Sequence, residues 1–231
     1  MQIIRNGYTR SSFTVALGIA LFLQAITSLI SGTLFLGPFA DKSDIGKIML
    51  DTAQNQTTAH LSIFLDIITA LVIVWLGVLF FSLLQKTNKV WATTALALYI
   101  VEAGMLIMSK FFGYALIQTS AAYSANSNQA LETIGQVLLQ TKDFAYSMHM
   151  VPCGVGAVLF YYLLYKSKAV PSWLSLWGLI TIIPVLAGTL IKAYGIEVPF
   201  AVMLPYAPFE FFAGVFILVR GLSDKTLEIG D

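Results

Sequence analysis

Apolar residues fill six long stretches of this 231-residue chain, and polar segments separate them. A helix needs about 20 apolar residues to cross the ~30 Å hydrocarbon core of a bilayer. The stretches that meet this length are about 12–36, 60–84, 90–116, 144–165, 171–194 and 198–221. The pattern therefore predicts an all-α polytopic membrane protein, a bundle of six transmembrane helices in a single domain over residues 1–231.

Two longer connections, about 37–59 and 119–142, each contain an amphipathic segment. The apolar positions are Ile45, Ile48 and Met49 in the first and Leu131, Ile134, Val137 and Leu138 in the second. Such segments lie on the bilayer surface or cap a cavity, and the pattern leaves both arrangements open.

The charge content agrees with a membrane protein. Only 11% of the residues are charged, against about 25% in a soluble domain. The net charge of +1 provides no basic surface for nucleic acid, so membrane lipid is the expected partner, and a homo-oligomer is left open. Cys153 is the single cysteine, which excludes a disulfide within the chain.

Lysine and arginine predict the orientation. In a six-span arrangement eight of them fall on one side, namely Arg5, Arg10, Lys86, Lys89, Lys166, Lys168, Arg220 and Lys225, and four on the other, namely Lys42, Lys47, Lys142 and Lys192. The positive-inside rule then places both termini in the cytoplasm.

Three carboxylates, Asp66, Glu102 and Glu210, interrupt the apolar stretches. A charge at membrane depth costs several kcal/mol unless a partner, a proton or water compensates, so such residues often mark function. By helical rise, Glu102 and Glu210 lie near the bilayer middle, while Asp66 and His149 lie in the outer third. These depths predict a polar cavity that opens outward.

The candidate ligand- or proton-binding residues are Asp66, Glu102, Glu210, His149, Tyr206, Tyr99 and Lys110. An acid without a cation beside it can hold its proton at neutral pH, which suits a proton carrier but equally a structural hydrogen bond. The serine, threonine and glycine stripes on the same helices are typical of helix–helix contacts.

Lys110 and two prolines bear on the shape of the site. Lys110 could pair with Glu102 or Asp66, but it comes about 20 residues into its span, which favours a side chain that reaches the outer headgroups. Pro205 and Pro208 bracket Tyr206 and could bend the last helix around a cavity.

Known catalytic patterns are missing from the chain. His60 and His149 are the only histidines, and no metalloprotease spacing, nucleophile elbow or phosphate-binding glycine loop occurs. We therefore expect no metal and no cofactor, and the catalytic residues stay unknown.

Several short runs resemble a family of bacterial integral membrane proteins described as domain of unknown function 4386. The matching positions are Asp66 with Asn88-Lys89, Ile100-Val101-Glu102-Ala103, Ala121-Ala122-Tyr123, Tyr165-Lys166-Ser167 with Pro171, and Glu210 with Arg220-Gly221. The run from Lys142 to Tyr146 departs from the family pattern. The resemblance implies a multi-pass protein of the bacterial inner membrane and leaves its activity open.

Three functions fit these observations. The first is binding or proton-coupled transport of a small amphipathic, cationic or lipid-like ligand. The second is an intramembrane enzyme that acts on a lipid with a carboxylate and His149 as acid and base. The third is a structural or immunity-type subunit that binds a partner protein.

Overall fold

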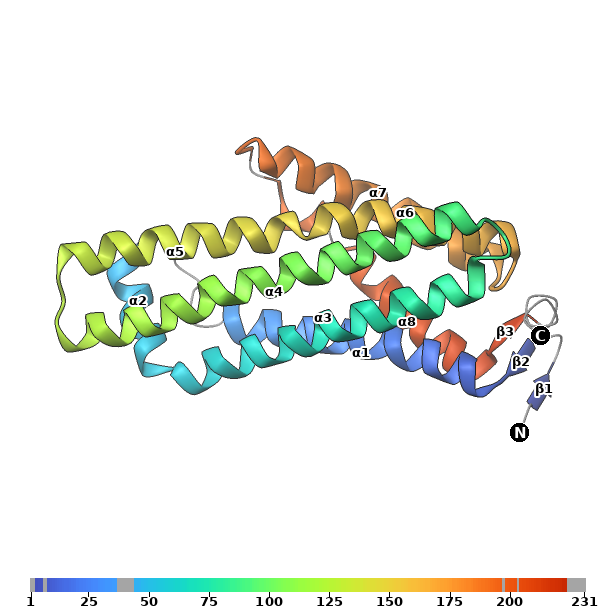
Figure 1. Cartoon of the computed structure of the whole chain (residues 1–231), viewed down its shortest axis with the longest axis horizontal. Coiled ribbons are helices and arrows are strands. Elements are labelled where there is room, and N and C mark those ends of the chain that lie inside the picture. The colour runs from blue at the N-terminus through green and yellow to red at the C-terminus, as the bar shows by residue number, and fades with distance from the viewer. Residues whose placement is uncertain (1–2, 6–7, 37–43, 197, 203, 224–231) are drawn as a thin grey trace.

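Helices make up nearly all of the described chain (Figure 1). The computed structural model describes residues 3–5, 8–36, 44–196, 198–202 and 204–223. Its elements are β1 (Ile3–Arg5), β2 (Tyr8–Arg10), α1 (Ser12–Leu36), α2 (Ile45–Gln54), α3 (Gln56–Leu84), α4 (Lys89–Ala125), α5 (Gln129–Met148), α6 (Met150–Ser167), α7 (Ser172–Ala193), a 3₁₀ turn η2 (Phe200–Val202), α8 (Tyr206–Arg220) and β3 (Leu222–Ser223). The predicted all-α fold is confirmed.

The outer surface of the helices is apolar. Leu71, Phe111 and Ile180 expose 62%, 66% and 67% of their surface, which water would penalise and lipid tails accept. Among the described residues, five helical stretches are long and apolar enough to cross a membrane. The chain is therefore a multi-pass membrane protein.

The sixth predicted span, 198–221, forms less helix than expected. Only α8, with 15 residues, is α-helical there, which corresponds to about 22 Å at 1.5 Å per residue. Pro205 caps α8 and Pro208 lies in its first turn, where the missing N–H of a proline is tolerated. The two prolines therefore mark the beginning of α8 and do not bend it in the middle, as the sequence had suggested they could.

The helices α4 and α5 form a long hairpin. The 37 residues of α4 span about 55 Å, more than a bilayer core requires. The predicted amphipathic segment near Leu131 is not a separate helix but the beginning of α5. The short helix α2 buries Ile48 against Leu116 and Leu139 of the hairpin, so its apolar side contacts protein.

The contacts between helices bring polar residues of different helices close to one another. Helix α1 packs between α3 and α8, while α4 packs against α3, α5 and α6. The antiparallel sheet β1-β2-β3 pairs residues from both ends of the described chain. Figure 1 shows this sheet at one end of the bundle and the α4–α5 connection at the other. The hydrophobic pattern had predicted no strands.

Candidate functional site

His149 lies at the junction between α5 and α6. The first helix ends at Met148 and the second begins at Met150. Pro152 has no N–H, so it cannot continue the helical hydrogen bonding to the carbonyl of Met148. His149 is 7% exposed, and the junction therefore places an imidazole inside the bundle.

Asp66 and Lys110 form a buried ion pair between α3 and α4. The ammonium also lies 4.5 Å from the centroid of the Tyr146 ring on α5, a cation–π contact. Lys110 is 8% exposed, so the expectation that it extends to the outer headgroups is wrong. The pair compensates both charges, since a carboxylate and an ammonium are each costly to bury alone.

Glu102 lies on α4, eight residues before Lys110, and beside His149. Its Oε1 atom is 4.0 Å from His149 Nδ1, too far for a direct hydrogen bond. The carboxyl group also interacts with the thiol of Cys153 on α6. Within the described part of the chain, Glu102 Oε2 and His149 Nδ1 have no hydrogen-bond partner. Buried polar atoms are usually paired, so these two atoms need a hydrogen-bond partner that the described residues do not supply.

Glu210 is held by donors from two helices. Tyr206 donates to Glu210 Oε1 at 2.8 Å, and Gln24 Nε2 of α1 donates to the same oxygen at 3.1 Å. The hydroxyl of Tyr161 on α6 lies 2.7 Å from that of Tyr206 and donates to it, because the proton of Tyr206 is directed to Glu210. The result is a chain of hydrogen bonds that ends at a carboxyl group.

The Glu102 and Glu210 groups belong to one network. The two carboxyl groups interact electrostatically, and Tyr99 of α4 interacts with both. The ring of His149 packs edge-on against Tyr146, with 5.1 Å between centroids, which connects this network to Lys110. All seven sequence candidates therefore lie in connected interactions, from Asp66 on α3 to Glu210 on α8.

Four further members of the network were not among the candidates. Gln24 has a sequence signal, since it is an amide inside an apolar stretch. Tyr146 and Cys153 also have one, because they lie three residues before and four after His149 and so share its helix face. Tyr161 has no distinguishing signal, as tyrosines are common in membrane helices.

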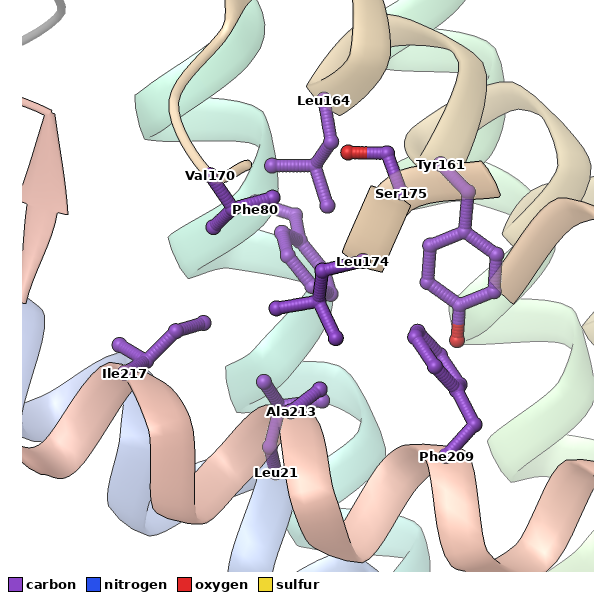
Figure 2. A pocket seen from close by; sticks show the side chains of 10 residues that line it. All are labelled: Leu21, Phe80, Tyr161, Leu164, Val170, Leu174, Ser175, Phe209, Ala213 and Ile217. Carbon is purple, nitrogen blue, oxygen red and sulfur yellow. The ribbon is translucent and has the colours of Figure 1, made fainter. Parts of the chain in front are cut away.

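A small apolar cavity lies near the end that carries the sheet (Figure 2). Helices α1, α3, α6, α7 and α8 and the α6–α7 turn surround it, with Phe80, Tyr161, Leu174 and Ile217 among its lining side chains. Ser175 also lines it, and its hydroxyl has no partner among the described residues. This cavity differs from the predicted one, which is polar and opens at the opposite side; that cavity stays a prediction.

The network has carboxyl, imidazole, thiol and phenol groups, which can hold and transfer protons. Within the described ranges, no group of three or more His, Cys, Asp or Glu residues is arranged to hold a metal ion.

Comparison with known proteins identifies a family but no individual relative. No curated protein and no solved structure matches the chain. The family model described as domain of unknown function DUF4386 matches residues 16–221, nearly the whole chain. The chain therefore belongs to this family, as its sequence motifs predicted.

Proposed function

We propose that this protein binds a small amphipathic cation within the membrane and exchanges it for protons held by Glu102 and Glu210. One observation carries the proposal: the buried Glu102 and the partly buried Glu210 interact electrostatically, and within the described residues neither has a lysine or arginine partner. Asp66 differs, because Lys110 already neutralises it.

The chemistry follows from the electrostatic interaction between the two acids. Two carboxyl groups that interact in a low-dielectric environment are costly to ionise together, so the pair favours keeping a proton. A bound cation replaces that proton as the compensating charge. The other titratable groups that face this pair are His149, Cys153, Tyr99, Tyr161 and Tyr206.

The test is an exchange assay in sealed proteoliposomes. The vesicles contain the pH indicator pyranine, and ethidium serves as the amphipathic cation in the external buffer. An imposed pH gradient should drive ethidium movement, and ethidium should in turn release protons. We expect Glu102→Gln and Glu210→Gln each to lower the exchange rate at least tenfold, because an amide cannot carry a proton or a charge.

Glu132→Gln is the matched control. Glu132 accepts a hydrogen bond from Tyr123 near the α4–α5 connection, outside the network, and glutamine keeps an acceptor there. This variant should exchange at the parental rate. Exchange by the parent that matches protein-free vesicles, or full exchange by both network variants, would reject the proposal. Size-exclusion elution and the helical circular dichroism signal confirm that each variant is folded.

A second candidate function rests on the His149–Glu102 contact. An imidazole 4.0 Å from a carboxyl group can act as a general base with a single water between them. If the protein is an enzyme for a lipid, incubation with a bacterial polar lipid extract should change the lipid mass spectrum. His149→Ala should abolish that change, and His60→Ala, which alters an exposed histidine, should preserve it.

A further inference from the structure

Three unpartnered atoms in the network are all able to accept hydrogen bonds. They are Gln24 Oε1, Glu102 Oε2 and His149 Nδ1. Their residues are 8%, 2% and 7% exposed, and they come from α1, α4 and the α5–α6 junction. Among the described residues, the network therefore has a deficit of donors.

Each of the three atoms has a lone pair that can accept a hydrogen bond. The amide nitrogen of Gln24 donates to Glu210, which leaves its carbonyl oxygen as the free end. An ionised carboxylate oxygen can only accept, and Nδ1 of a neutral imidazole accepts when Nε2 carries the proton. The nearby ammonium of Lys110 is already engaged by Asp66 and the Tyr146 ring, so it does not satisfy them.

We infer that the ligand of this site is a protonated primary amine, because such a cation brings several N–H donors together with its charge. The inference rests on the proposed function and narrows its ligand class. A quaternary ammonium ion has the same charge but no N–H group, so it would leave all three acceptors unpaired. Buried acceptors without partners disfavour a ligand that lacks donors.

Two probes of similar size and equal charge test this inference. Hexylamine and hexyltrimethylammonium are titrated into the full-length protein in phosphatidylcholine nanodiscs at pH 7 and followed by calorimetry. Protein-free nanodiscs correct for partition into lipid. Hexylamine should bind at least tenfold more tightly than hexyltrimethylammonium.

Variants identify the source of the preference. Gln24→Leu and His149→Phe each remove one acceptor without removing a carboxylate, and each should reduce the preference for hexylamine at least threefold. Gln140→Leu is the matched control, since Gln140 is exposed on α5, and it should keep the full preference. Having two variants keeps the test valid if one of them does not fold.

Each outcome is informative. Equal affinity for both probes would overturn the inference while the proposed cation site stands. A preference that survives in both folded variants would also overturn it, because the acceptors would not be its origin. Binding of neither probe would reject the inference together with the proposed function, and would indicate that water alone satisfies these atoms.

Discussion

Replacement of Asp66 by asparagine tests the buried ion pair most directly. The change keeps the size of the side chain and removes its charge, so the ammonium of Lys110 loses the carboxylate that it contacts. Asp66 is 4% exposed and Lys110 is 8% exposed. Neither group can therefore exchange its partner for bulk water without movement of α3 or α4.

The expected cost follows from these positions. Removal of one partner from a buried pair costs about 3–5 kcal/mol, because the other charge stays uncompensated. The Tyr146 ring, 4.5 Å from the ammonium, is present in both the parent and the variant, so its contact does not change this difference. We therefore expect Asp66→Asn to lower the free energy of unfolding by about 3–5 kcal/mol.

The double variant Asp66→Asn/Lys110→Met completes a thermodynamic cycle. It removes both charges, so it should lose at least about 1 kcal/mol less than the sum of the two single variants. Unfolding is measured in dodecyl maltoside with increasing sodium dodecyl sulfate, by circular dichroism at equilibrium. Additive losses, or a loss below about 0.5 kcal/mol for Asp66→Asn, would refute a stabilising pair.

Other positions give independent predictions in the same unfolding assay. Ser175→Ala removes an unpartnered buried hydroxyl and should raise stability by about 1 kcal/mol; a clear loss would contradict this. Tyr206→Phe deletes the donor to Glu210 and should cost about 1–2 kcal/mol, which an unchanged midpoint would disprove. Gly214→Ala places a Cβ 2.9 Å from the backbone of α1 and should cost about 1–3 kcal/mol. Gly104→Ala meets open space and is its control; equal effects would argue against tight α1–α8 packing.

Much of the site could be predicted from the sequence, because a polar residue inside an apolar stretch is visible without a structure. Asp66, Glu102, Glu210 and His149 were found in this way. Their partners were harder to predict, since pairing depends on how each helix is rotated and how far it is shifted along its neighbour. Lys110 illustrates this: its place in the span favoured the headgroups, whereas the packing of α3 against α4 places it beside Asp66.

The sequence by itself determined the membrane class, the helical fold and the family, because hydropathy and spacing are local properties of the chain. Only the tertiary structure decided which acids have a cation. It joined Gln24 of α1 to Glu210 of α8, 186 residues apart, and left Glu102 beside His149 with an oxygen that has no partner among the described residues. The physical reason is that the cost of a buried charge depends on the atoms around it, and distant segments supply those atoms only when the helices pack.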